Sequence, residues 1–263
     1  MFFVVNKEKI KTYLISVGTV FLLLITSIAL RNNVLNSTVE TSNSIIKMPI
    51  CKIKMEEKKL ALSINCTQNM DNISNILDTL SKMRVTASFF VTGDVIDKYP
   101  EEVKKIISNN NEVGNMCNHY TSLKAKSKNE IRNEIVECSR KIENLTGKTT
   151  NLLRIPYGEY NNSILEVAES EKMNTIAWNI DPLDYNDLTT EEMWEIIEEN
   201  LIPGSIILLH NEYIGESLET LIHNIQEKGY TITNVSNIIY KDNYQINDKG
   251  EQYVLNWNCN WWR

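Results

Sequence analysis

The chain has 263 residues, a formal net charge of −7 at pH 7 and a sequence pI of about 5.2. This length suits one large domain with a sizeable core plus a further short segment. Because proteins that bind nucleic acid carry a basic surface, the acidic balance argues against nucleic acid as a partner.

The first predicted element is an apolar helix near the N-terminus. Residues 12–30, TYLISVGTVFLLLITSIAL, carry no charge and are nearly long enough to cross ~30 Å of hydrocarbon. Lysines precede the run, so residues 1–11 are expected in the cytoplasm and the large domain outside it. A cleaved signal peptide is the alternative, but the run is long for one and no small-x-small cleavage site follows.

The remaining sequence divides by composition into a linker, a domain and a tail. Residues 31–56 are rich in Asn, Ser and Thr, as expected for a linker. Strand and helix patterns alternate from residue 57 to residue 240. Residues 241–263 form a tail with several tryptophans, whose rings could pack on the domain, stack on sugars or lie at a membrane interface. Packing on the domain is the default expectation.

Seven short apolar or β-branched runs predict strands that are buried on both faces. Amphipathic helix patterns lie between most of them, and this alternation predicts a parallel sheet, open or closed into a barrel. In both architectures functional side chains gather at the carboxyl ends of the strands. The predicted strands are Leu60–Cys66, Ala87–Val91, Glu112–Asn115, Leu152–Arg154, Asn174–Ile180, Ser205–His210 and Tyr230–Asn234.

Several helix boundaries are also marked in the sequence. Pro100 is typical of a first helical turn. Capping-box patterns begin at Ser127 and at Thr189, each with a glutamate three residues later. Gly229 follows the last long helix pattern, as a C′ glycine does.

Six separated segments resemble those of the polysaccharide deacetylases that share the NodB-type domain, in the same order and spacing. The resemblance covers about Leu60–Tyr240 and implies an α/β fold, an irregular (β/α) barrel of seven strands. The initial MFFVVNKEKIK and the methionine in NEVGNM are closer still to the PdaB-like sporulation subgroup. The six segments are LALSINCT, ASFFVTGD, NEVGNMCNHYTSL, LLRIPYGEYN, WNIDPLDY and GSIILLHN.

The resemblance implies that the base and the metal ligands are missing. Active members read T-F-D-D-G in the first segment, where one aspartate is the general base and the next binds the metal; Asn65 and Cys66 stand there. Met116 and Tyr120 replace the two histidines of a His-x-x-x-His pattern. An amide cannot act as the base near neutral pH, and a thioether or neutral phenol is a poor zinc ligand. We therefore expect no metal cofactor, although the family uses a divalent metal such as zinc.

The other half of the family's site is present. Asp184 and His210 match the pair in which a carboxylate orients an imidazole that protonates the leaving amine. Arg154 matches the arginine that faces the base. A lone histidine at the end of an apolar strand is also compatible with a purely structural role, but the register of the other motifs favours an inherited one. The expected substrate-binding residues are Tyr157, Gly158 and Tyr185.

Without a base aspartate, Arg154 needs another acceptor or access to water, because a buried unpaired guanidinium costs several kcal/mol. Asp184 and Asp181 are the candidate partners. The cysteines show no CxxC spacing, which argues against a zinc site or a disulfide framework. A substitute metal site formed by Cys66, Cys117 and His119, or a Cys66–Cys117 disulfide, remains open beside the expected inert packing.

These patterns predict a membrane-anchored, extracytoplasmic protein of the cell wall or forespore envelope, with cell-wall or spore glycan as its partner. The missing base and ligands favour a catalytically degenerate member that binds glycan without turnover. The alternative is an active hydrolase that removes N-acetyl groups, through a non-peptide C–N bond, from the amino sugars of peptidoglycan.

Overall fold

The computed structural model describes residues 47–254 of the chain. The predicted cytoplasmic N-terminus, the anchor at residues 12–30 and the tail tryptophans lie outside the described residues. Within residues 47–254, none of the helices combines the length and the apolar character needed to cross a membrane.

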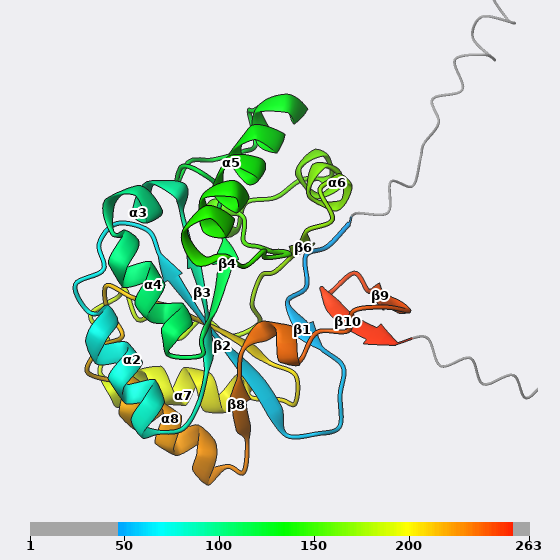
Figure 1. Cartoon of the computed structure of the whole chain (residues 1–263). Helices are drawn as coiled ribbons and strands as arrows, with labels where there is room; N and C mark the ends of the chain where they lie inside the picture. The colour runs from blue at the N-terminus through cyan, green and yellow to red at the C-terminus, as the bar shows by residue number, and fades with distance from the viewer. Residues whose placement is uncertain (1–46, 255–263) are drawn as a thin grey trace, which may run out of the picture. The chain divides into compact units, whose positions relative to one another are not determined.

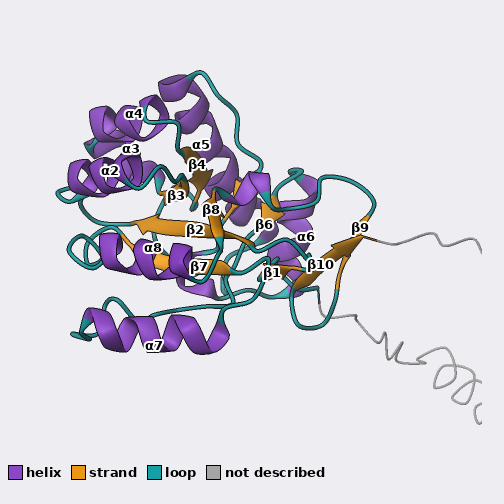
Figure 2. Cartoon of the chain, turned by 90° about the horizontal axis from the view of Figure 1, so that it is seen from below, coloured by secondary structure: helices purple, strands orange, loops and turns teal. Residues whose placement is uncertain are grey.

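A seven-stranded parallel sheet forms the centre of the fold (Figures 1 and 2). Its order is β6-β5-β4-β3-β2-β7, and β8 pairs with the first residues of β2. Each predicted strand has a counterpart in the structure, so the α/β class and the parallel arrangement are confirmed. The sheet is curled like part of a barrel. The strands are β2 (Lys59–Cys66), β3 (Ala87–Val91), β4 (Glu112–Asn115), β5 (Leu152–Leu153), β6 (Asn174–Thr175), β7 (Ile206–His210) and β8 (Thr231–Thr233).

The side chains of β2 alternate between two cores. Leu62, Ile64 and Cys66 belong to the cluster formed with the helices outside the sheet. Ala61 belongs to the inner cluster on the other face, and Asn65, an even number of residues further on, takes the same face because strand side chains alternate. The sequence LALSINC therefore places two polar side chains, Ser63 and Asn65, on the inner face, with Asn65 at the carboxyl end of the central strand.

The predicted strand Asn174–Ile180 is more irregular than the sequence suggests. Regular pairing stops at Thr175, the end of β6. The following residues still approach β7: Ile180 forms an isolated parallel bridge with Ile207, and the backbone N–H of Leu208 donates to the carbonyl oxygen of Ile180 at 2.9 Å. This irregular segment carries the chain from β6 back to the far edge of the sheet.

Helices cover the outer face of the sheet (Figure 1). The capping boxes at Ser127 and Thr189 are both formed, Pro100 occupies a first turn, and Gly229 has a φ of +80° beyond the last long helix, so these predictions are confirmed. The helices are α2 (Ile73–Lys82), α3 (Gly93–Lys98), α4 (Pro100–Ser108), α5 (Lys128–Thr146), α6 (Asn162–Ser170), α7 (Thr190–Asn200) and α8 (Leu218–Glu227), with short 3-10 turns η1 (Pro156–Gly158) and η2 (Val235–Asn237).

A small second sheet joins residues from both ends of the described chain. β1 (Lys52–Ile53) pairs in parallel with β10 (Glu251–Val254), which pairs antiparallel with β9 (Tyr244–Ile246). Ile50 and Ile53 are each 1% exposed. The folded unit therefore includes residues that composition assigns to the linker and to the tail. These segments are mostly polar, but their buried isoleucines and their backbone pairing stabilise them as part of the fold.

Candidate functional site

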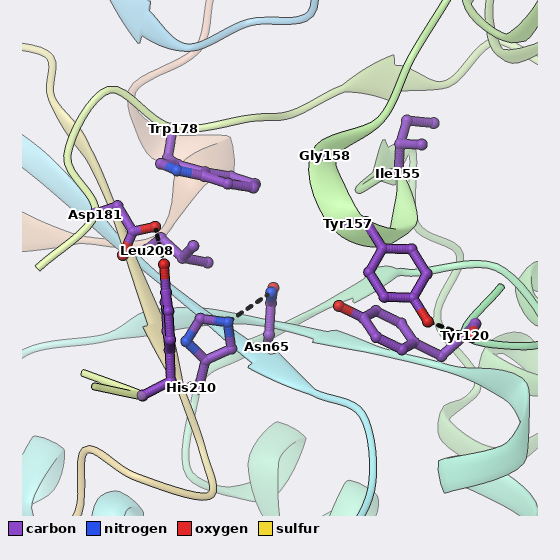
Figure 3. A pocket seen from close by; sticks show the side chains of 10 residues that line it. Asn65, Tyr120, Ile155, Tyr157, Gly158, Trp178, Asp181, Leu208 and His210 are labelled. Carbon is purple, nitrogen blue, oxygen red and sulfur yellow. Dashed lines mark hydrogen bonds between the residues drawn. The ribbon is translucent and has the colours of Figure 1, made fainter. Parts of the chain in front are cut away.

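A cavity of about 310 Å³ opens at the carboxyl ends of β2 and β7 (Figure 3). Asn65 and His210 lie opposite each other in the register of these two strands. The parallel sheet thus brings together two side chains that are far apart in the sequence, at the edge where such sheets hold their sites. The other predicted residues that line the cavity are Tyr120, Tyr157, Gly158 and Tyr185.

Asp184 holds the imidazole of His210 in one orientation. Its Oδ1 lies 2.7 Å from Nδ1, and its Oδ2 accepts a hydrogen bond from the backbone N–H of His210 at 2.7 Å. Because a carboxylate can only accept, Nδ1 carries a hydrogen and Nε2 is the nitrogen available to the cavity. The Asp184 side chain has no exposed surface. This is the geometry that the predicted orienting role of Asp184 requires.

Arg154 lies beneath the floor of the cavity and holds Asn65. Its Nη1 donates to Asn65 Oδ1 at 3.1 Å, and its Nη2 donates to Ser63 Oγ at 2.9 Å and to the carbonyl oxygen of Ala177 at 3.1 Å. Its Nε donates to the carbonyl oxygen of Ile176 at 3.4 Å. All these acceptors are uncharged.

The prediction that Asp184 or Asp181 pairs with Arg154 is wrong. Both oxygens of Asp184 bind His210, and Asp181 Oδ1 accepts from the backbone N–H of Leu183 at 2.9 Å. The loop that carries the two aspartates therefore satisfies them with its own groups and with β7.

Within the described part of the chain, Arg154 consequently keeps a buried charge without a carboxylate partner. It is 1% exposed, and among residues 47–254 it forms no ion pair. Burial lowers the pKa of Arg154 to about 9, which still leaves the side chain a cation at neutral pH. Its guanidinium carbon lies 4.1 Å from the ring centroid of Phe90 and 5.3 Å from that of Trp178. These cation–π contacts replace part of the lost hydration.

The residues at the expected metal-ligand positions do not fit a divalent cation. Cys66 is packed in the outer core, where burial raises the pKa of its thiol well above the usual range. Met116 is 1% exposed in the inner core. The Tyr120 ring stacks on Tyr157 with centroids 4.4 Å apart, and burial raises the pKa of Tyr120. Within residues 47–254, no three His, Cys, Asp or Glu side chains converge in a metal-binding arrangement.

The alternatives that involve Cys117 and His119 do not form either. Cys66 and Cys117 are free thiols, and Cys117 is buried among side chains of α5 and α6. The backbone N–H of His119 donates to a Glu134 carboxylate oxygen at 2.9 Å, and its Nδ1 lies 3.2 Å from both oxygens. His119 therefore anchors its loop to α5 and does not line the cavity.

Four aromatic side chains line the cavity: Tyr120, Tyr157, Trp178 and Tyr185. Figure 3 shows the Trp178 indole over the cavity, with the rings of Tyr120 and Tyr157 to one side. The Tyr185 ring meets the His210 ring edge-on, with centroids 5.3 Å apart, and the centroid of the Tyr213 ring lies 6.3 Å from that of His210. Such rings bind the apolar faces of sugars and similar ligands.

Sequence reasoning missed Trp178, Tyr213 and Ser63 as parts of this site. Trp178 begins the segment WNIDPLDY, and Tyr213 follows His210 by three residues. Ser63 precedes Asn65 by two residues in a strand, so the two share a face. Strand alternation was a usable signal for Ser63, whereas the positions of Trp178 and Tyr213 depend on irregular loops.

Together these features define an α/β protein whose curled parallel sheet holds a cavity with the His210–Asp184 pair, Asn65 and several aromatic rings at the carboxyl ends of its strands. The sequence profile of the polysaccharide deacetylase family matches residues 52–176. Residues 52–176 therefore carry a polysaccharide deacetylase domain.

Related proteins support this assignment. Over 177 residues the chain is 27% identical to a peptidoglycan-N-acetylglucosamine deacetylase of Bacillus cereus, covering 65% of this chain and 64% of that protein. It is 29% identical over 184 residues to the peptidoglycan-N-acetylmuramic acid deacetylase PdaC of Bacillus subtilis, covering 69% of this chain and 39% of that protein. The chain thus spans less than two thirds of the length of either relative.

Among solved structures, a CE4 family pseudoenzyme from Bacillus anthracis superimposes with a TM-score of 0.70 at 28% identity. The match covers 72% of this chain and 68% of that one. A mutant of the same pseudoenzyme, described as having restored enzymatic activity, matches with the same TM-score.

Proposed function

We propose that this protein is a catalytically inactive member of its family that binds peptidoglycan or a related envelope glycan in the cavity. The observation that carries the proposal is the state of Asn65. It occupies the base position as a neutral amide whose oxygen is held by Arg154, so the position lacks a group that can take a proton from water. The replaced ligand positions remove the means of activating that water with a metal.

Backbone strain around the cavity supports a retained binding role. Tyr157 and Leu183 have φ values of +61° and +59°, a conformation that costs a residue with a side chain about 1–2 kcal/mol. Tyr157 forms part of the cavity wall, and Leu183 lies in the loop between Asp181 and Asp184. Strain of this kind persists where function requires the geometry.

The ligand class follows from the relatives and from the aromatic wall. The Bacillus relatives are named for N-acetylated sugars of peptidoglycan, and the rings around His210 offer flat apolar surfaces for pyranose rings. The cavity volume of about 310 Å³ lies at the lower end of the range for small-ligand pockets. One sugar residue in the cavity, with its neighbours on the exposed tyrosines, is the arrangement we favour.

An active hydrolase is the second candidate, and one observation favours it. The His210–Asp184 pair is fully assembled with a distance of 2.7 Å, as a general acid needs. Such an enzyme would have to activate water without the usual base. His210 would then have to serve both as base and as acid.

The two candidates are separated by measuring acetate release and glycan binding on the same protein. We expect no acetate from N-acetylglucosamine oligomers with added zinc, cobalt or nickel, and saturable binding of the same oligomers by calorimetry. Turnover that depends on a metal and disappears in His210→Ala would establish the hydrolase. The absence of both turnover and binding would refute the binding proposal.

We also propose that the apolar segment at residues 12–30 anchors the domain at the outer face of the membrane, in the cell wall or forespore envelope, as in the PdaB-like sporulation subgroup. The charge distribution around the segment supports this orientation. Membrane fractionation with and without residues 1–30 tests the anchor. Adding protease to intact cells tests on which side of the membrane the domain lies, because only a domain outside the membrane would be cleaved.

A further inference from the structure

A second cavity lies at the opposite edge of the parallel sheet from His210. Its volume is about 330 Å³, similar to the 310 Å³ of the cavity at the carboxyl ends, and the two share no lining residue. Glu112, the first residue of β4, and Asn151, which directly precedes β5, both line it. This second cavity therefore opens at the amino ends of the strands, between the ends of α4 and α5 and the residues around η2.

The carboxylate of Glu112 is held in place but keeps one oxygen available. Its Oε2 accepts a hydrogen bond from the Ser88 hydroxyl and another, at 3.3 Å, from the backbone N–H of Ser236. Among residues 47–254, Oε1 accepts no hydrogen bond and Glu112 forms no ion pair. Because Glu112 is partly buried, its charge is less screened by water than that of an open surface carboxylate and attracts a cationic group more strongly.

The amide of Asn234 is a second unsatisfied group in the wall of this cavity. The next residue, Val235, donates its backbone N–H to Ser88 Oγ at 2.8 Å and so fixes the chain against β3. Asn234 Oδ1 is buried without a hydrogen-bond partner, and Nδ2 finds no acceptor within residues 47–254. A buried polar group without a partner is costly and rare. A polar occupant of the cavity toward which the amide could turn would recover the missing bond.

The rim of the second cavity carries the opposite charge. Lys148 is exposed, lies in the loop between α5 and β5, and forms no ion pair with any of residues 47–254. The remaining wall is aliphatic, with Ile107 from α4, Val113 from β4 and Ile142 from α5. The cavity thus combines a carboxylate, an ammonium and an aliphatic surface.

A free α-amino acid with an aliphatic side chain matches these three features. Its ammonium group can donate to Glu112 Oε1, and its carboxylate can accept from Lys148, while its side chain contacts the aliphatic wall. A diamine or a metal cation would be repelled by Lys148, and a phosphate would be repelled by Glu112. A neutral sugar would leave both charges without a partner.

We propose that the cavity lined by Glu112, Lys148 and Asn234 is a binding site for a free aliphatic α-amino acid. This site lies at the other end of the sheet from the cavity proposed to bind glycan. The inference therefore goes beyond the proposed function and does not depend on it.

The test uses leucine and its two singly charged analogues in isothermal titration calorimetry with the full-length protein in mild detergent at pH 7. 3-Methylbutylamine lacks the carboxylate of leucine, and 4-methylpentanoate lacks its ammonium group. We expect leucine to bind saturably with a Kd of about 1 mM or tighter. Each analogue should bind at least tenfold more weakly, because each leaves one charge of the cavity without a partner.

Two variants locate the site. Glu112→Gln should weaken leucine binding at least tenfold, and its amide oxygen can still accept from Ser88 and Ser236. Lys148→Met should weaken it at least fivefold, and this exposed change should leave the fold intact, which a thermal melt verifies. The matched controls are Glu56→Gln and Lys249→Met, because both residues are exposed and lie outside the lining of the cavity. They should leave the leucine affinity unchanged.

Each contrary result overturns the inference and leaves the proposed glycan binding standing. These results are no saturable leucine binding, equal affinity for leucine and either analogue, or unchanged leucine affinity in folded Lys148→Met. Displacement of leucine by the tetramer of N-acetylglucosamine would also overturn it, because leucine would then occupy the cavity next to His210. Leucine binding without any glycan binding would support the inference and refute the proposed function.

Discussion

Replacing Asn65 by aspartate should stabilise the protein, which is unusual for a charge introduced at a site only 4% exposed. The new carboxylate would lie next to Arg154, which now binds the Asn65 oxygen at 3.1 Å. For charges about 4 Å apart and an effective dielectric constant of ~20, the attraction is about 4 kcal/mol. Burying the carboxylate costs several kcal/mol, but the existing hydrogen bonds to the oxygen remain. We expect a net gain of about 1–2 kcal/mol, or about 2–8 °C in Tm for a domain of this size.

Urea denaturation and thermal melts followed by circular dichroism measure this gain. The control is Asn115→Asp on the adjacent strand β4, where the fully buried amide donates to the carbonyl oxygen of Ile135 and to Ser139 Oγ, each at 2.8 Å. Without a cation beside it, that change should cost about 3 kcal/mol or more. If Asn65→Asp destabilises the protein as much as the control, Arg154 does not carry the uncompensated charge that we infer.

The stabilisation should also depend on pH in a defined direction. Arg154 should lower the pKa of the introduced carboxyl below its unfolded value of about 3.9. A group with a depressed pKa in the folded state binds fewer protons there than in the unfolded state. The extra stability should therefore be complete well above pH 3.9 and be lost as the pH falls through the lower, folded value. A gain that persists undiminished at acid pH would refute the electrostatic explanation.

Three further predictions follow from the same geometry. Arg154→Met should lower the free energy of unfolding, measured by denaturant, by about 2–3 kcal/mol, because it leaves buried hydrogen-bond acceptors without a donor. A decrease below ~0.5 kcal/mol would mean that the floor of the cavity is not assembled as described. Burial raises the pKa of the Cys138 thiol to about 12, so iodoacetamide mapping at pH 8 should label Cys138 only after unfolding, and labelling of the native protein would contradict its packing. Restoring the family's residues should create zinc affinity measurable by calorimetry, and a folded variant without it would show that the positions are misaligned. The restored set is Asn65→Asp, Cys66→Asp, Met116→His and Tyr120→His.

The sequence by itself determined the strands and the residue types at the site. Short apolar runs predicted the strands from Ala87–Val91 onward. A strand that is buried on both faces has few polar residues, so it stands out in the sequence as an almost continuous apolar run. Capping boxes predicted the starts of α5 and α7 correctly, since each depends only on residues within one turn. The sequence also shows directly that position 65 carries an amide, which cannot take up a proton near neutral pH, because proton affinity is a property of the side chain itself.

Only the tertiary structure decided how these residues meet. The partners of Arg154 come from β2 and from the chain after β6, and nothing local in the sequence indicates that neutral acceptors rather than Asp181 or Asp184 would reach it. The burial of Cys66 in the outer core and the closure of the irregular segment after β6 onto β7 are equally non-local. Local patterns fix which groups a chain presents, but the distances between groups on different strands depend on packing across the whole sheet. That packing gave this site a buried cation under an amide.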